Sequence, residues 1–236
     1  MSNETLDLDQ LARYLRRDAR EVGKLADRGD LPGRKVGGAW RFARAEVQHW
    51  LEKQLHTFSE SELKAVEADH PEPTEPLLTS LLRGECVAVP LPASTRSSVF
   101  RELVKLAEQS WQVYDADAIL TAIQAREELA STAQDNGIAV LHPRRPLPAA
   151  LGESVVAFGH TIRGLPFGAP GGGLTDLFFL VCCRDDRTHL RVLARLARLF
   201  QKPGFLDRLR SAESSAEALH TLRDAETELI AADAAA

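Results

Sequence analysis

One histidine of this chain stands where a short strand could hold a nucleophile. His142 ends an apolar run, Ile138–Leu141, that directly follows an Asn-Gly turn signal. A neutral imidazole is a good nitrogen nucleophile near pH 7. It can carry a phosphoryl group if a fixed guanidinium and a second imidazole neutralise the incoming charge. Arg126, upstream, and His189, downstream, are the candidates for those two groups.

Composition describes an ordinary globular protein. The chain has 236 residues, 44% of them hydrophobic and 27% charged, which suits one large domain or a small domain plus a medium one. A net charge of −5 argues against a protein that coats nucleic acid throughout. Because neither a signal peptide nor an apolar stretch of about 18 residues is found, we expect a cytoplasmic protein with no membrane insertion.

Charge is segregated along the chain. Residues 10–44 carry ten Lys/Arg against four acids, whereas residues 57–77 carry six acids against one lysine. This pattern indicates a basic recognition module followed by an acidic linker, which the prolines of 71–76 keep free of regular structure. We predict a DNA-binding domain at 1–56, a linker at 57–76, whose residues 59–66 could extend the preceding helix, and a larger domain at 77–236.

The first domain begins with two closely joined helices. Apolar residues at helical spacing predict a helix over 8–15. Asp18 and Glu21 form a capping-box signature that opens a second helix, which we expect to end near Gly29. Two helices joined so tightly form a helix-turn-helix.

A hairpin and a closing helix follow. Gly37 and Gly38 supply the positive φ angles of a tight turn between two short strands within 34–42. Val47, Trp50 and Leu51 mark the last helix. This run, with its G-x-L-P…K-V-G-G-x-W-R-F pattern, resembles the excisionase/MerR-type winged helix-turn-helix.

That resemblance implies that DNA is a partner. We expect Arg20 and Lys24 to enter a groove, and a dimer to be needed for useful affinity because one such module has a small footprint. The alternative is a solvated, charged helix face. The predicted DNA-binding residues are Arg17, Arg20, Lys24, Arg28, Arg34, Lys35 and Arg41, the last three on phosphates.

The larger domain mixes two periodicities. Helical spacing occurs within 99–107, 119–123 and 190–200, and apolar runs of strand length occupy 155–158 and 177–183. Mixed strands and helices over this length predict a single α/β domain.

The context of His142 identifies a family. Arg126-Glu127 and, later, Asn136 through Arg144 match R-E…G-N-G-I-A-I-P-H-G-R, so residues 77–228 resemble the IIA type-2 domain of the bacterial sugar phosphotransferase system, in its fructose/mannitol and nitrogen-regulatory branch. The resemblance implies a mixed sheet flanked by helices. It also implies that His142 accepts a phosphoryl group from a phosphohistidine on a small carrier protein, with no cofactor and no metal.

The resemblance assigns roles to the supporting residues. Arg126 would stabilise the phosphoryl oxygens and His189 would hydrogen-bond the phosphoryl group, because the transition state is loose and rich in charge. Thr132 and Arg144 would help to shape the pocket. The alternatives are a loop histidine at 142, a surface Arg126 paired with a neighbouring glutamate, and an N-terminal helix residue at 189.

The match has departures. Leu141 replaces the family's proline and Pro143 its glycine, so a backbone donor is lost beside the histidine. Glycines before the Asn-Gly turn are also lost, and Asp135 would repel phosphate if it pointed inward. These changes leave open a domain that binds partners without transferring phosphate.

Other sequence features are interpreted as structural and not functional. Gly171–Gly173 lacks the Gly-Lys-Ser/Thr ending of a phosphate loop and predicts a turn. Cys182 and Cys183 are interpreted as buried small hydrophobes. Asp185-Asp186 predicts a turn, and His160 is assigned no role.

Together these signals predict a two-domain, DNA-binding transcription regulator linked to nitrogen or sugar metabolism through a phosphohistidine. Two alternatives remain: a phosphotransfer component that serves a separate sugar permease, and a non-catalytic pseudo-IIA regulator.

Overall fold

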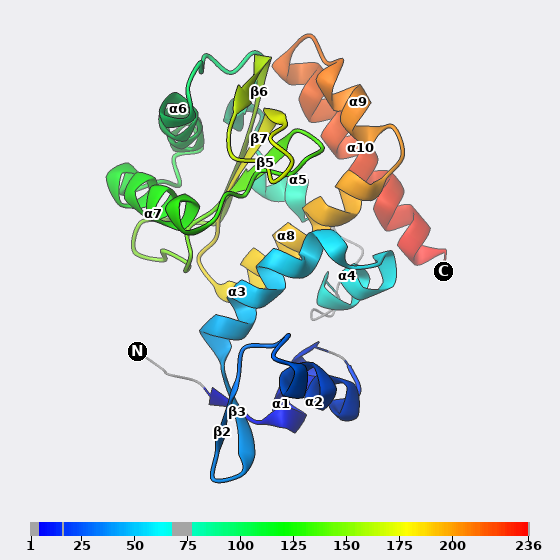
Figure 1. Ribbon diagram of the computed structural model, residues 1–236. Helices are drawn as coiled ribbons and strands as arrows, with labels where there is room; N and C mark the ends of the chain where they lie inside the picture. The colour runs from blue at the N-terminus through cyan, green and yellow to red at the C-terminus, as the bar shows by residue number, and fades with distance from the viewer. Residues whose placement is uncertain (1–4, 16, 68–76, 236) are drawn as a thin grey trace. The chain divides into compact units, whose positions relative to one another are not determined.

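The computed structural model describes residues 5–15, 17–67 and 77–235. The chain divides into two compact units, residues 1–72 and 73–236, coloured blue to cyan and cyan to red in Figure 1. Within the described ranges, no helix has both the length and the apolar character that crossing a membrane requires.

The first unit holds a small antiparallel sheet. Its strand order is β1 (Thr5–Leu6), β3 (Ala39–Ala43), β2 (Arg34–Val36). Gly37 and Gly38 have φ angles of 59° and 81°, so the predicted glycine turn joins β2 to β3. Strand β1 was not predicted, because two residues are too few to show an alternating pattern.

Three helices complete this winged helix-turn-helix: α1 (Leu8–Leu15), α2 (Ala19–Arg28) and α3 (Arg44–Gln54). Asp18 caps α2 by accepting a hydrogen bond from the Arg20 backbone N at 2.8 Å, and Gly29 ends it in the left-handed region. Phe42 is fully buried and stacks on Trp40, which gives the hairpin its core contact.

Helical structure also occupies part of the predicted linker. A short 3-10 turn, η1 (Leu55–Thr57), is followed by α4 (Glu60–Glu67). Glu62 accepts a hydrogen bond from the Ser59 backbone N at 2.9 Å and forms an ion pair with Arg17, which ties α4 to the helix-turn-helix. The remaining linker residues, 68–76 with their prolines, lie outside the described residues.

The second unit is built on a mixed, four-stranded sheet. Its order is β4 (Val87–Ala88), β6 (Val155–Pro166), β7 (Leu174–Cys182), β5 (Ile138–Leu141). Strands β6 and β7 form an antiparallel hairpin, while β5 pairs with β7, and β4 with β6, in parallel. Leu177–Val181 of β7 has no exposed surface, as expected of a strand covered on both faces.

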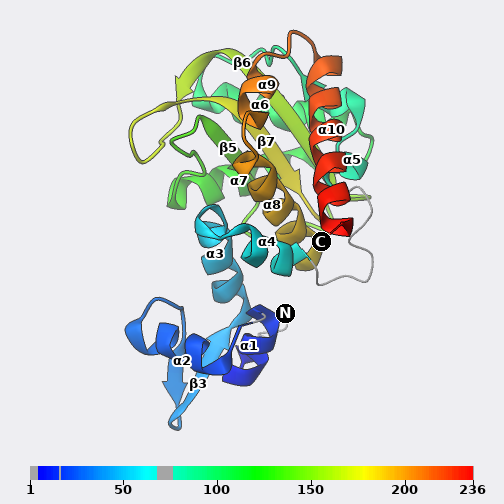
Figure 2. The same ribbon diagram turned by 90° about the vertical axis from the view of Figure 1, so that its right-hand side faces the viewer.

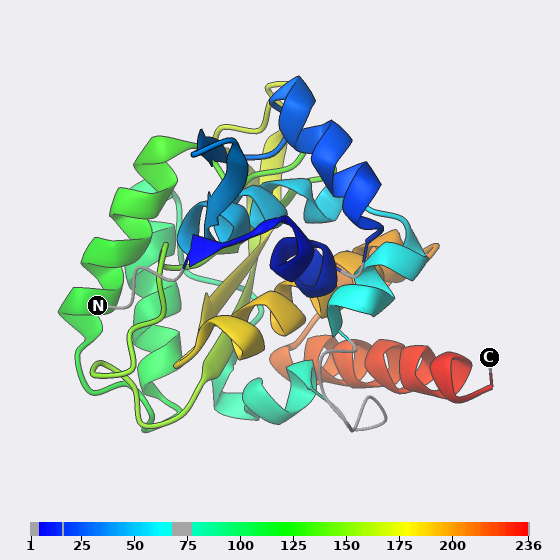
Figure 3. The ribbon, with the colours of Figure 1, turned by 90° about the horizontal axis from the view of Figure 1, so that it is seen from below.

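Helices cover both faces of this sheet. Helices α6 and α7 lie on one side and α8, α9 and α10 on the other, which the perpendicular views of Figures 1, 2 and 3 confirm. The predicted α/β class, with a mixed sheet flanked by helices, is therefore confirmed. The helical elements are α5 (Leu78–Leu81), η2 (Gly84–Cys86), α6 (Arg96–Glu108), α7 (Ala116–Leu129), α8 (Asp186–Gln201), α9 (Phe205–Arg210) and α10 (Ser215–Ala234).

Candidate functional site

Strand β5 positions His142. The strand starts after Gly137, whose φ of +84° closes the turn, and the Gly137 carbonyl accepts hydrogen bonds from the backbone N–H groups of Asp176 and Leu177. From there β5 runs in register with β7, ending at Leu141 opposite Leu180. His142 is the next residue, so its backbone is fixed by a buried parallel strand pair.

A backbone contact sets the tautomer of His142. Its Nδ1 lies 2.9 Å from the carbonyl oxygen of Val140. A carbonyl can only accept, so Nδ1 carries the hydrogen and donates it. In the neutral ring the lone pair is then on Nε2, which is the nucleophilic nitrogen.

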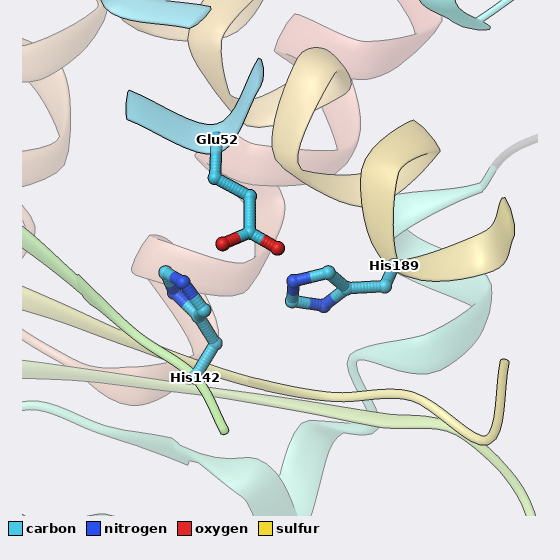
Figure 4. A group of neighbouring side chains, drawn as sticks. All are labelled: Glu52, His142 and His189. Carbon is cyan, nitrogen blue, oxygen red and sulfur yellow. The ribbon is translucent and has the colours of Figure 1, made fainter. Parts of the chain in front are cut away.

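His189 lies against His142. The two ring centroids are 5.1 Å apart and the ring planes are inclined by 55°. Figure 4 shows the rings facing one another from the end of β5 and the first turn of α8. They meet because β5 and β7 are parallel: His142 follows the carboxyl end of one strand and α8 follows that of the other. Asp185 caps α8, accepting from the Thr188 backbone N at 2.9 Å.

Arg126 is anchored to a segment that runs beside β5. Its Nη1 donates to the carbonyl oxygen of Ala130 at 2.8 Å. Ala133 forms an isolated antiparallel bridge with Ala139, so the segment that follows α7 runs beside β5. Arg126 is thus held against the end of α7, where the segment that runs beside β5 begins.

The two predicted supporting residues differ. The backbone N of Thr132 donates to the carboxylate of Glu127, and among the described residues its Oγ1 has no hydrogen-bond partner. Arg144 is exposed, beyond Pro143. Thr132 therefore lies in the segment beside β5 with a buried hydroxyl, and Arg144 lies in the loop that follows β5.

In the first unit, the predicted basic residues form an exposed set on α2 and the hairpin. Arg20, Lys24 and Arg28 recur at helical spacing on α2 and are exposed, while Val22 and Ala26 on the same helix are buried. Arg28 pairs with Asp30 at 2.9 Å across the end of the helix. The exposed side of helix α2 thus carries these three basic residues together with two acids, Glu21 and Asp27.

The hairpin carries its own cations. Arg34 and Arg41 are cross-strand partners and, with Gln10 among other residues, line a hollow of about 450 Å³. Lys35 pairs with Asp27 at 3.1 Å and lies 5.0 Å from the Trp40 ring centroid.

Arg17 differs from the other predicted residues. It is half-buried, pairs with Glu62 and lies 5.3 Å from the Phe58 ring centroid. These contacts within its own unit account for its position.

Comparison with known proteins assigns both units to families. Residues 80–225 match the family described as phosphoenolpyruvate-dependent sugar phosphotransferase system, EIIA 2, and residues 5–55 match a helix-turn-helix domain family. The chain belongs to the EIIA type 2 family. The predicted fusion of a helix-turn-helix to such a domain is confirmed.

Similar proteins share the EIIA part. A nitrogen regulatory protein of Pseudomonas aeruginosa is 31% identical over 141 residues, which is 57% of this chain and 86% of the relative. A PTS system fructose-specific EIIA component of Haloferax volcanii is 28% identical over 148 residues, 62% of this chain and 92% of the relative. Among solved structures, nitrogen regulatory protein IIA-Ntr from Neisseria meningitidis has a TM-score of 0.56 at 24% identity, covering 62% of this chain and 99% of that one. The likeness to this solved structure shows that the second unit has the same fold.

Two residues of the EIIA domain were missed by sequence reasoning. Glu127 was considered only as a surface partner of Arg126, but its side chain is buried and accepts from Thr132, Ser131 and Arg96. The Arg-Glu pair was the signal available. Arg96, far upstream, gave no signal, because only the packing of α6 against α7 brings it there.

The remaining signals in the EIIA domain are structural. Asp135 accepts from the Gly171 backbone N at 2.7 Å, so its carboxylate is engaged by the glycine-rich turn between β6 and β7. That turn joins two strands, as predicted. His160 pairs with Leu177 at the start of β7, the end of the sheet away from His142, and burial lowers its pKa, with Arg210 lowering it further and Asp176 opposing.

Proposed function

We propose that this protein is a DNA-binding regulator whose EIIA domain accepts a phosphoryl group on Nε2 of His142 from the phosphohistidine of a carrier protein. The observation that carries the proposal is the contact of Nδ1 with the Val140 carbonyl, which leaves Nε2 as the nucleophile, next to the ring of His189. Membership of the EIIA type 2 family supports it.

The reaction follows from these positions. The lone pair of His142 Nε2 attacks phosphorus, and the P–N bond of the donor phosphohistidine breaks with its electron pair returning to the donor imidazole. The transition state is loose, so catalysis depends on positioning and charge. The Arg126 guanidinium offsets the negative charge of the phosphoryl oxygens. His189 donates a hydrogen bond to one of these oxygens, and the Thr132 hydroxyl donates another. The phosphoryl group stays covalently bound, and no cofactor takes part.

Phosphoryl transfer is tested with purified components. The chain is incubated with labelled phosphoenolpyruvate, enzyme I and the histidine phosphocarrier protein, and acid-labile, alkali-stable label is counted. Wild type should take up one equivalent and His142→Ala none. The control is His160→Ala, at the other end of the sheet, which should label normally. Label that persists in His142→Ala overturns the site; no label on the wild type favours the pseudo-IIA alternative, which the loss of the N–H at Pro143 would explain.

DNA binding is proposed from the first unit. Arg20 and Lys24 on α2 are assigned to the groove, and Arg34 and Arg41 to phosphates. Arg34 and Arg41 are cross-strand partners that line one hollow with Asp7, and a phosphate there would meet two guanidinium groups against one carboxylate. The helix-turn-helix match supports this assignment.

The DNA experiment measures affinity against salt. Arg20→Ala and Lys24→Ala should each weaken binding by about 1–3 kcal/mol, and Arg34→Ala should flatten the salt slope by about one. Lys105→Ala, an exposed lysine of α6, is the control. Absence of any binding at low salt would remove the DNA role and favour a phosphotransfer component that serves a separate permease.

The two activities are proposed to be coupled. Phosphorylation adds nearly two negative charges to the chain, so DNA affinity should differ between the phosphorylated and unphosphorylated wild type. His142→Ala should show one affinity under both treatments. If the phosphorylated and unphosphorylated wild type bound DNA with equal affinity, phosphorylation would not control DNA binding.

A further inference from the structure

Glu127 places a carboxylate where α7 ends and the segment beside β5 begins. Only 1% of its side chain is exposed. Its two oxygens lie 3.0 and 3.1 Å from the backbone N of Thr132, and Oε1 also accepts from Ser131 Oγ at 2.8 Å. Burying a carboxylate is costly unless donors surround it, so these contacts select one conformation of the turn.

Other segments converge on the same carboxylate. Arg96, the first residue of α6, places Nη2 3.3 Å from Glu127 Oε1, and its guanidinium lies 5.3 Å from the ring centroid of Phe167. Ser131 Oγ is also 3.0 Å from the Phe167 carbonyl oxygen. Glu127 thus connects α6, α7 and the loop after β6, and Arg96 balances its charge.

The proposed ligands of the phosphoryl group depend on this turn. Arg126 is anchored by the carbonyl of Ala130, inside the turn, and the backbone of Thr132 is held by Glu127 itself. If the turn relaxed, both Arg126 and Thr132 would shift relative to His142. A displacement of about 1 Å in such a group can slow a reaction by about 100-fold.

We infer that Glu127 is a positioning residue for phosphoryl acceptance: its carboxylate fixes the turn that sets Arg126 and Thr132 beside His142. This inference rests on the proposed function. Glu127 acts through its neighbours, because a carboxylate in contact with phosphoryl oxygens would repel them.

The test measures initial rates of His142 labelling over a range of phosphocarrier concentrations, in the full-length chain. Glu127→Gln keeps one acceptor oxygen for the Thr132 amide and should lower the maximal rate about tenfold; Glu127→Ala keeps none and should lower it about 100-fold. The half-saturating carrier concentration should stay within about twofold. Rates are normalised to the final label stoichiometry, so a merely misfolded fraction would not change them.

The matched control is Glu128→Gln, which alters the exposed neighbouring acid and should label at the wild-type rate. If Glu127→Ala does not fold, Glu127→Asp, which keeps the charge but shortens its reach, should still be slowed. Wild-type rates in Glu127→Gln and Glu127→Asp, or equal slowing in Glu128→Gln, overturn this inference alone. No label on the wild type overturns the proposed function and this inference with it.

Discussion

Gly137 holds the start of β5 in a backbone conformation that side-chain-bearing residues adopt at a cost. Its φ is +84°, and a Cβ there would lie 2.6 Å from Arg210 Nη2 and 3.0 Å from Asp176 Oδ1. Those two side chains pair through Arg210 Nε at 2.9 Å, and Arg210 also donates to the Asn136 carbonyl. The absence of a side chain at Gly137 therefore permits both the turn before β5 and the Arg210–Asp176 ion pair that packs against that turn.

Gly137→Ala should destabilise the EIIA domain for both reasons. The left-handed conformation costs about 1–2 kcal/mol for an L-residue, and displacement of Arg210 adds to it. Gly172→Ala is the matched control, since Gly172 has φ +74° with nothing within 4 Å of its Cβ position. In urea unfolding, Gly137→Ala should lower the free energy of unfolding more than Gly172→Ala does. Equal decreases for the two variants would mean that the contact with Arg210 contributes nothing.

The cysteines should be inert in the native protein. All three are buried, and burial raises the pKa of Cys86 to about 11 and that of Cys183 to about 12. Cys182 is shifted upward by the same cause. Since the thiolate is the reactive form, an aromatic disulfide reagent at pH 8 should modify no thiol until denaturant is added, and then all three. Rapid modification of Cys182 or Cys183 in the native protein would show that the carboxyl end of β7 opens to solvent.

At the scale of elements, a distant side chain caps α5. This short helix has no side-chain cap of its own. Glu226 on α10 accepts from the backbone N–H groups of Leu77, Leu78 and Thr79 at 2.9, 2.7 and 2.9 Å, and Arg195 on α8 donates to it at 2.7 Å. The amides at a helix start lack partners within the helix, so one buried ion pair joins three helices.

Glu226→Ala should therefore be strongly destabilising. It leaves the Arg195 charge buried without Glu226 and removes the cap of α5, which should lower the free energy of unfolding by about 3–5 kcal/mol. Glu228→Ala removes an acid two residues later on α10 that pairs with Lys202 near the surface and should change stability little. Chemical denaturation of the second unit compares the two; similar small losses would contradict the capping role.

Elements differ in how far sequence could predict them. Helices α6, α7 and α8 and strand β7 have long periodic or continuous apolar patterns, and all were predicted. Strands β1 and β4 are two residues long, and α5 depends on Glu226, so no local pattern marks them. The same division applies to the site: His142, His189 and the Arg126-Glu127 pair stand in a family context, whereas Arg96 reaches Glu127 only through a contact between segments distant in sequence.

At the scale of the whole molecule, the two units differ in the stability that size allows. A unit of about 160 residues buries close to 70% of the surface its unfolded chain exposes, while one of about 70 residues buries nearer 60% and is more marginal. The units are residues 1–72 and 73–236. We therefore expect two separate unfolding transitions, with the helix-turn-helix unit melting first.

Separated fragments should then keep separate activities. Fragment 73–236 should accept label at His142 within about twofold of the full-length rate and bind no DNA, because the residues proposed to accept and bind the phosphoryl group all belong to it. Fragment 1–72 should bind DNA with the full-length salt slope, since counterion release depends on the phosphates contacted and not on the rest of the chain. Calorimetry of the intact protein and of both fragments, run beside the labelling and binding assays, provides the comparison. A single transition in the intact protein, with both fragments unfolded, would mean that neither unit is stable without the other.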